Sequence, residues 1–254
     1  MKLFDLTGKV AVITGSSRGI GRAMAEAMAD HGARVVISSR KQDACDSVAA
    51  AINAAHGPGT ATAIAASISS KEALQDLVNR TRAEVGEIDI LVCNAASNPY
   101  YGPMSGISDD QFRKVLDNNV LSNHWLIQMC LPGMIARRDG AIIVVSSIGG
   151  LRGSATLGAY TISKAADMQL VRSLAVEVGQ HNINVNAIAP GLIRTDFAKA
   201  LWDNPEAQAH YNSSHPMRRI GEAGEVAGAG VFLASPGGRY VNGQTIVVDG
   251  GSTI

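Results

Sequence analysis

The sequence predicts a single-domain α/β protein with a mostly parallel β-sheet covered by helices on both faces. Short β-branched apolar runs are each followed by a longer, alanine-rich stretch with helical periodicity, which is the rhythm of strand–helix–strand units. The chain has 254 residues, 46% of them hydrophobic and 17% charged, which suits one compact soluble domain with a large core. A parallel sheet built from such units is buried on both faces.

The elements are predicted from these runs in chain order. The clearest strands are 10–14, 34–38, 88–93, 141–146, 184–188 and 245–248, and the helices are 23–31, 71–86, 109–137, 160–179 and 225–233. Glycine and proline stand where helices should stop or strands turn, at Gly32, Gly86, Gly140, Gly179 and Pro190. The least periodic stretch, about 195–221, is the expected substrate loop of the one domain, 1–254.

The composition argues against several classes of protein. Lys plus Arg and Asp plus Glu both number 22, so no excess of positive charge favours nucleic acid or an anionic membrane. Cys45, Cys93 and Cys130 lack paired spacing, which argues against disulfides and a zinc site. With no signal-peptide pattern at the start and no apolar run of about 18 residues, we expect a cytoplasmic protein without metal.

A glycine-rich run, TGSSRGIG from Thr14, follows the first strand and opens a helix. Its glycines permit a tight turn and close backbone approach to a pyrophosphate, and the helix start supplies free N–H donors and the positive end of a dipole. Many strand-to-helix turns need glycine for backbone reasons alone, so the run by itself is weak evidence. The residues expected to contact a dinucleotide here are Gly15, Ser17, Arg18, Gly19, Ile20 and Gly21.

The end of the second strand indicates which dinucleotide is bound. A carboxylate there would bind the ribose 2′-hydroxyl of NAD, but the chain has Ser39 and Arg40, as a 2′-phosphate requires. Arg18 can approach that phosphate from a second side; the alternative is that both arginines are solvated surface residues. NADP(H) is therefore favoured over NAD(H). Asn94 and Ala95 end the next strand, where Asn94 either stabilises the centre of the sheet or borders the adenine ribose.

A second group of polar residues indicates carbonyl chemistry. A strand ends at Ser147, and the next helix carries Tyr160 and Lys164 four residues apart. That spacing puts the phenol and the ammonium on one helical face, so the cation favours the phenolate and the tyrosine can act as general acid or base. Ser147 can donate a hydrogen bond to the substrate oxygen as negative charge develops there.

With these residues in this order, the sequence resembles the classical short-chain dehydrogenases/reductases along essentially its whole length. The matches are the glycine run, Asn94-Ala95, Asn119, Ser147, Tyr160, Lys164 and Pro190-Gly191. The resemblance implies a Rossmann-type three-layer α/β/α fold with about seven strands, a homotetramer, and hydride transfer between the nicotinamide and a small carbonyl or alcohol substrate. The runs VVISSRK, ILVCNAASNP and APGLIRT are similar to an NADP-dependent carbonyl reductase/retinol dehydrogenase subgroup.

The resemblance also implies roles for particular residues. Tyr160 exchanges the proton with the substrate oxygen, Lys164 also binds the nicotinamide ribose, Ser147 orients the substrate, and Asn119 holds a water in a proton relay. Asn119 lies 28 positions before Ser147, as the family pattern requires. The remaining cofactor contacts are expected from Ile68, through its backbone, and from Pro190, Gly191, Ile193 and Thr195.

Several functions share these residues. The leading hypothesis is an NADP(H)-dependent oxidoreductase of a ketone and its secondary alcohol. The alternatives are a 3-oxoacyl-thioester reductase and an NAD-linked polyol or hydroxysteroid dehydrogenase. The complete Asn-Ser-Tyr-Lys set argues against a non-catalytic dinucleotide sensor, and the four-residue step from Tyr160 to Lys164 argues against an enoyl-thioester reductase, which usually has a longer one.

Overall fold

The computed structural model describes residues 2–203 and 205–254, without the side chains of Ala200, Ala207 and His210. In the described residues seven strands form one parallel sheet in the order β3-β2-β1-β4-β5-β6-β7. The strands are β1 (Val10–Thr14), β2 (Arg34–Ser38), β3 (Ala61–Ala63), β4 (Ile90–Cys93), β5 (Gly140–Val145), β6 (Ile183–Pro190) and β7 (Thr245–Val248). The α-helices are α1 (Gly19–Asp30), α2 (Gln42–His56), α3 (Lys71–Glu84), α4 (Asp109–Leu116), α5 (Ser122–Arg137), α6 (Gly158–Val178), α7 (Lys199–Trp202), α8 (Pro205–Ser214) and α9 (Ala223–Ala234).

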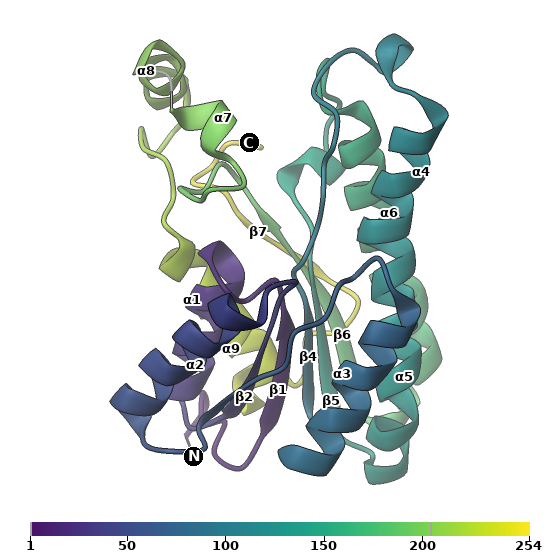
Figure 1. Cartoon of the computed structure of the whole chain (residues 1–254). Coiled ribbons are helices and arrows are strands. Elements are labelled where there is room, and N and C mark those ends of the chain that lie inside the picture. The colour runs from purple at the N-terminus through teal and green to yellow at the C-terminus, as the bar shows by residue number, and fades with distance from the viewer. Residues whose placement is uncertain (1, 204) are drawn as a thin grey trace.

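Helices cover both faces of the sheet (Figure 1). On one face α1, α2 and α9 enclose a core that includes Met24, Met28 and Val226. On the other face α3, α5 and α6 enclose a second core that includes Leu77 and Leu126. The predicted three-layer α/β/α architecture is therefore confirmed, with strands buried on both sides as a parallel sheet requires.

The strand order reverses between β1 and β4, which are neighbours in the middle of the sheet and pair with each other in parallel. Val12 of β1 lies beside Val36 of β2 on one side and Leu91 of β4 on the other. Ligands of such sheets bind outside the carboxyl ends of the strands at this reversal. In Figure 1 this is the upper edge of the sheet, where α7 and α8 also lie.

The elements differ from the sequence-based expectations in five places. The strand β3 and the helix α2 were not predicted, because β3 has three small residues and α2 buries only Cys45, Val48, Ala49 and Ile52. The helix expected over 109–137 is interrupted by a π-helical turn, Asp117–Leu121. The segment 195–221 carries α7 and α8 in place of an irregular loop, and α1 begins at Gly19, before the predicted start.

Candidate active site

The glycine-rich turn between β1 and α1 is built for close approach of backbones. Gly15 and Gly19 have φ of 67° and 57°, in the left-handed region that favours glycine. A Cβ at Gly21 would lie 2.5 Å from the carbonyl oxygen of Gly15 and closer still to Nδ2 of Asn94. Larger residues at these positions would therefore displace the turn.

Asn94 holds this turn against the end of β4. Its Nδ2 donates to the carbonyl oxygens of Thr14 (2.9 Å) and Gly15 (3.2 Å). The Thr14 hydroxyl accepts from the backbone N–H groups of Asn94 and Ala95, at 3.1 Å each. Two roles were open for Asn94, and these contacts show that it stabilises the centre of the sheet.

The start of α1 faces the same edge with unsatisfied donors. Arg18 stands at the cap position without a side-chain cap hydrogen bond, and no acidic residue lies in the first turn. The first N–H groups of a helix have no partners within the helix, and they attract anions. This arrangement fits a pyrophosphate group, as the sequence predicts.

The end of β2 carries no carboxylate at the predicted ribose position. Ser39 makes an Oγ–Sγ contact of 3.2 Å with Cys45, and Arg40 is exposed, with no acidic partner among the residues the structure describes. Arg18 instead lies 3.4 Å from Asp196, and both side chains are exposed. Arg40 is thus free to meet an anion, whereas Arg18 would have to exchange its partner.

The end of β6 meets the glycine turn. The Thr195 side chain lies 3.2 Å from where a Cβ on Gly19 would be. Gly191 donates its N–H to the carbonyl oxygen of Val248 at 3.0 Å, and Ile193 is buried in the core. Thr195 and Gly19 therefore lie together, while Gly191 and Ile193 have structural contacts of their own. The Ile68 side chain likewise packs against the second core.

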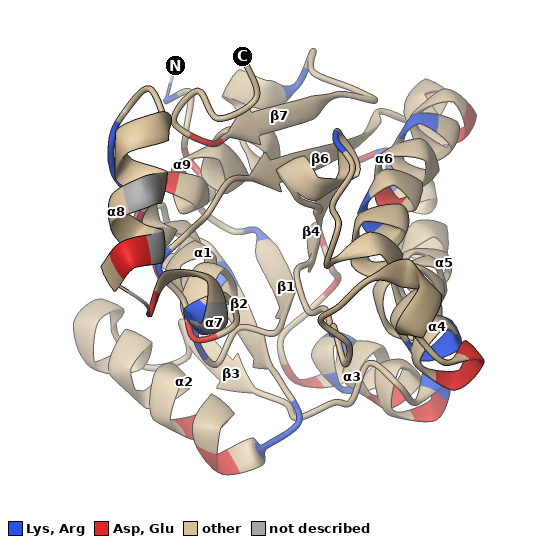
Figure 2. Ribbon diagram, turned by 90° about the horizontal axis from the view of Figure 1, so that it is seen from above, with Lys and Arg blue, Asp and Glu red and all other residues tan. Residues whose placement is uncertain are grey.

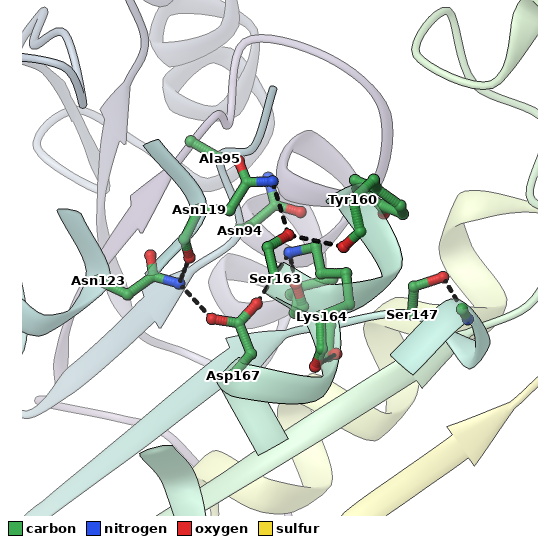
Figure 3. Close-up of polar contacts among 12 residues, drawn as sticks. Asn94, Ala95, Asn119, Asn123, Ser147, Tyr160, Ser163, Lys164 and Asp167 are labelled. Atoms are coloured by element: carbon green, nitrogen blue, oxygen red, sulfur yellow. Dashed lines mark hydrogen bonds and ion pairs between the residues drawn. The ribbon is translucent and has the colours of Figure 1, made fainter. Parts of the chain in front are cut away.

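Ser147 follows the end of β5, and Tyr160 and Lys164 lie in the first two turns of α6 (Figure 3). The Lys164 ammonium is 5.7 Å from the centre of the Tyr160 ring. The Ser147 Oγ accepts from the N–H of Gly149 at 3.0 Å, and among the described residues neither its proton nor the Tyr160 hydroxyl has a hydrogen-bond partner. Both hydroxyls are available to a substrate oxygen, although Figure 3 shows no contact between them.

Asn119 lies in the π-helical turn, a feature common at functional sites. Its side chain is fully buried and donates to the Ser97 carbonyl oxygen and the Ser163 hydroxyl, at 3.0 Å each. Its own carbonyl oxygen accepts from Nδ2 of Asn123 at 2.6 Å. Asn119 therefore joins the segment after β4 to α5 and α6 beside the predicted catalytic residues.

Sequence reasoning missed a buried carboxylate behind Lys164. The ammonium donates to Asp167 at 3.0 Å and to the Val145 carbonyl oxygen at 2.9 Å. Burial is the largest single influence on the pKa of Lys164 and lowers it. The charge and hydrogen bond of Asp167, together with the nearby Tyr160 and Cys93, outweigh burial and leave this pKa above its usual value. Burial raises the pKa of Asp167, opposed by Lys164 and by Asn123. The three-residue step from Lys164 to Asp167 on one helix was the available signal.

Phe197 is a second residue that the sequence did not single out. Its ring centre lies 6.1 Å from that of Tyr160, and its side chain is 56% exposed. It belongs to the segment expected to cover the substrate, just before α7. An exposed aromatic ring beside the predicted acid–base residue offers an apolar surface to a ligand.

Basic and acidic residues are equal in number, 22 of each. Viewed from above, Figure 2 shows basic and acidic residues interspersed on the outer helices, while the strands are largely uncharged. In the described part of the chain no group of three or more His, Cys, Asp or Glu side chains is arranged to hold a metal. Within that part, no helix has the length and apolarity needed to cross a bilayer. The three cysteines are buried and free.

The family comparison covers nearly the whole chain. Residues 15–253 match the family model described as enoyl-(acyl carrier protein) reductase. Dehydrogenase/reductase SDR family member 4 of Bos taurus is 38% identical over 97% of this chain and 88% of its own length. The human dehydrogenase/reductase SDR family member 2, mitochondrial, is 41% identical over 98% of this chain and 88% of its own length.

Solved structures of similar sequence share the fold. A 7α-hydroxysteroid dehydrogenase complexed with NADH and 7-oxo glycochenodeoxycholic acid has a TM-score of 0.93 at 35% identity, covering 98% of this chain and 95% of its own. A 3-oxoacyl (acyl-carrier-protein) reductase of Agrobacterium tumefaciens C58 with NADP bound has a TM-score of 0.91 at 35% identity, covering 98% and 96%. The chain therefore belongs to the short-chain dehydrogenase/reductase family, whose members are oxidoreductases acting on CH–OH and C=O groups with NAD(P).

Proposed function

We propose that the chain is an NADP(H)-dependent oxidoreductase that interconverts a ketone and a secondary alcohol. The observation that carries this proposal is the meeting of two features at one edge of the sheet. The glycine turn with its uncapped helix lies at the reversal of the strand order, and Ser147, Tyr160 and Lys164 lie at the ends of the neighbouring elements. A dinucleotide and a reacting carbonyl can therefore be held side by side.

The chain's own residues handle the proton and the developing charge. Tyr160 donates a proton to the substrate oxygen during reduction and removes it during oxidation. Ser147 donates a hydrogen bond to the same oxygen, where negative charge grows as the carbonyl is reduced. Lys164 keeps a positive charge beside the phenol and would contact the ribose of the bound cofactor, whose nicotinamide would supply or accept the hydride.

The preference for NADP(H) follows from the end of β2. Ser39 and Arg40 stand where a carboxylate would select the 2′-hydroxyl of NAD, and the exposed Arg40 guanidinium suits a phosphate. One structural relative contains NADP and another contains NADH, so NAD(H) remains an alternative cofactor. The cofactor contacts proposed from the sequence, Arg18 and Ile68 included, belong to this proposal.

Two further substrate classes have support from the comparisons. The 3-oxoacyl (acyl-carrier-protein) reductase and the 7α-hydroxysteroid dehydrogenase have similar sequences and folds. A 3-oxoacyl thioester and a hydroxysteroid therefore belong in the substrate panel beside simple ketones and polyols. The matched family model is described as an enoyl reductase, so an enoyl thioester is included as well.

We also propose a homotetramer in the cytoplasm. The outer faces of α5 and α6 form a groove with apolar lining from Ile127, Leu131, Ile135 and Leu174 and polar lining from His124, Gln128 and Glu177, which suits contact with a second copy of the chain. Three free cysteines suit a reducing compartment. Sedimentation or light scattering of the purified protein tests the assembly, and a monomer at micromolar concentration would exclude it.

Calorimetric titration with NADPH and NADH tests the cofactor, and turnover of the substrate panel tests the reaction. We expect tighter binding of NADPH and reduction of at least one ketone. Tyr160→Phe should bind NADPH as tightly as the native protein but lose about 10²–10⁴-fold in turnover, the usual contribution of a general acid or base. Equal turnover in this variant would contradict the proposed role of Tyr160, and tighter NADH binding would contradict the cofactor preference.

A further inference from the structure

The buried carboxylate of Asp167 lies directly behind the proposed catalytic lysine. Asp167 is 0% exposed and Lys164 is 2% exposed, and their charged atoms are 3.0 Å apart. By contrast, the Arg80–Glu84 pair on the outside of α3 is about two-fifths exposed. A buried ion pair loses its hydration, and removing one partner leaves an uncompensated charge. The Asp167 carboxylate, in this buried position, therefore has a strong electrostatic effect on Lys164.

The contacts fix the orientation of the ammonium group. An ammonium has three donors, and two of those on Lys164 are used by Asp167 Oδ2 and the Val145 carbonyl oxygen. The other carboxylate oxygen accepts from Nδ2 of Asn123 at 3.0 Å. Figure 3 shows Asp167 and Asn123 together beside Lys164. The third donor of Lys164 has no partner among the described residues and is left for the side of the Tyr160 ring.

We propose that Asp167 is a positioning residue, which holds the Lys164 ammonium in place and balances its charge beside Tyr160. This inference rests on the proposed function, because it assigns Asp167 an effect on the acid–base residue of that reaction. The paired charges make the surroundings of the phenol nearly neutral, whereas Lys164 alone would favour the phenolate strongly. Asp167 therefore moves the pH range of the reaction upward.

Few other ionisable groups face this pair. They are the Tyr160 phenol on α6 and the Cys93 thiol at the end of β4. Burial raises the pKa of Cys93 well above its ordinary value of 9.0, so this thiol stays neutral over the range to be assayed. Asn119 and Asn123 are neutral. Replacing Asp167 by a neutral residue therefore changes the local charge by one unit as long as Lys164, whose pKa falls without that carboxylate, keeps its proton.

The size of the effect follows from two distances. Asp167 lies 3.0 Å from the Lys164 ammonium, which lies 5.7 Å from the centre of the Tyr160 ring. A unit charge within about 9 Å, at an effective dielectric constant of about 20, changes a protonation equilibrium by about one pH unit. Removing the negative charge favours the phenolate, so the shift is toward lower pH.

The test compares Asp167→Asn with the native protein. The acidic limb of the pH profile for alcohol oxidation, where the rate rises as Tyr160 loses its proton, should move to lower pH by about one unit. The tyrosinate absorbance, titrated without cofactor or substrate, should show the same shift, and subtraction of the spectra of Tyr160→Phe proteins isolates the phenol concerned. Asp167→Ser, which leaves space for a water beside Lys164, is the second variant and should shift in the same direction.

Glu84→Gln is the matched control, because it removes a carboxylate from an exposed ion pair on α3. It should leave both profiles unchanged. If folded Asp167→Asn and Asp167→Ser are less stable but keep the native limb and the native tyrosinate titration, Asp167 is only structural and the proposal is wrong. If the native protein reduces no carbonyl, the proposed function fails instead, and the tyrosinate titration still decides whether Asp167 controls the phenol.

Discussion

Replacing Gly21 by alanine tests whether the turn after β1 is closed as tightly as the structure indicates. The added Cβ would lie 2.5 Å from the Gly15 carbonyl oxygen and nearer still to Nδ2 of Asn94. Neither neighbour is the free end of a flexible side chain. The Gly15 oxygen is backbone, and the Asn94 amide is held by hydrogen bonds to the carbonyl oxygens of Thr14 and Gly15. The turn must therefore open to admit the methyl group.

The expected change in the free energy of unfolding combines two destabilising contributions and one stabilising contribution. Overpacking of this kind destabilises by about 1–3 kcal/mol, and loss of one Asn94 hydrogen bond adds about 0.5–1.5 kcal/mol. Alanine in a helix is favoured over glycine by about 1 kcal/mol, which offsets part of the loss. The net expectation is a decrease of about 2 kcal/mol in the free energy of unfolding, or about 4–8 °C in Tm for a chain of this size.

Thermal unfolding and NADPH titration measure the two consequences. Gly21→Ala should unfold at lower temperature and bind NADPH at least about tenfold more weakly, because the backbone N–H groups no longer meet the pyrophosphate. Gly228→Ala on α9 is the matched control. A Cβ there meets nothing within 4 Å, so this variant should gain about 0.5–1 kcal/mol. A Gly21→Ala protein with native stability and native NADPH affinity would refute the steric argument.

Three further predictions concern charge and burial. Arg40→Ala should weaken NADPH binding by about 1.5–3 kcal/mol, a lost charge-assisted contact, and leave NADH binding nearly unchanged; equal losses by calorimetry would exclude a phosphate contact. Burial raises the pKa of Asp139, but two basic partners lower it below its ordinary value of 3.8. The ionised Asp139 therefore stabilises the folded protein above pH 3.8, and this stabilisation is lost as the pH falls through the lowered pKa. On acidification, the urea concentration at the midpoint of unfolding should fall less in Asp139→Asn than in the native protein. Burial raises the pKa of Cys130 to about 12, and Cys93 is as deeply buried. Thiol reagents should therefore label neither cysteine until the chain unfolds. Rapid labelling of the native protein would contradict this prediction.

Much of the fold could be predicted because the strands are apolar and β-branched. Val10–Thr14 and the five other predicted strands are buried along nearly their whole length or lie at an edge with a clear pattern. The strand Ala61–Ala63 has neither property, and it pairs only with β2 at the edge of the sheet. Its position depends on tertiary pairing, which a local pattern does not record. The helix over 42–56 was missed for the related reason that its buried side carries just four residues, Cys45, Val48, Ala49 and Ile52.

The acid–base pair could be predicted from the four-residue step between Tyr160 and Lys164, but Asp167 could not be predicted from its residue type. Acidic side chains are almost never fully buried unless they are paired. The pairing becomes visible only when α6 is placed against β5, which brings the Val145 carbonyl oxygen to Lys164. The sequence therefore supplied the spacing along the helix, and the packing decides which of its polar residues meet.

The rotational position of α6 is what assembles these residues. One residue of helix corresponds to a turn of about 100°, so a shift by a single position would carry Tyr160, Lys164 and Asp167 away from the ends of β4 and β5. Two contacts at the backbone of Lys164 prevent this. The Ser146 hydroxyl donates to its carbonyl oxygen at 2.7 Å, and Gly150 packs so closely that a Cβ there would lie 2.7 Å from the Lys164 carbonyl carbon. Ser146 and Gly150, two small residues after β5, therefore determine the geometry of the proposed active site, although neither of them is expected to touch the substrate.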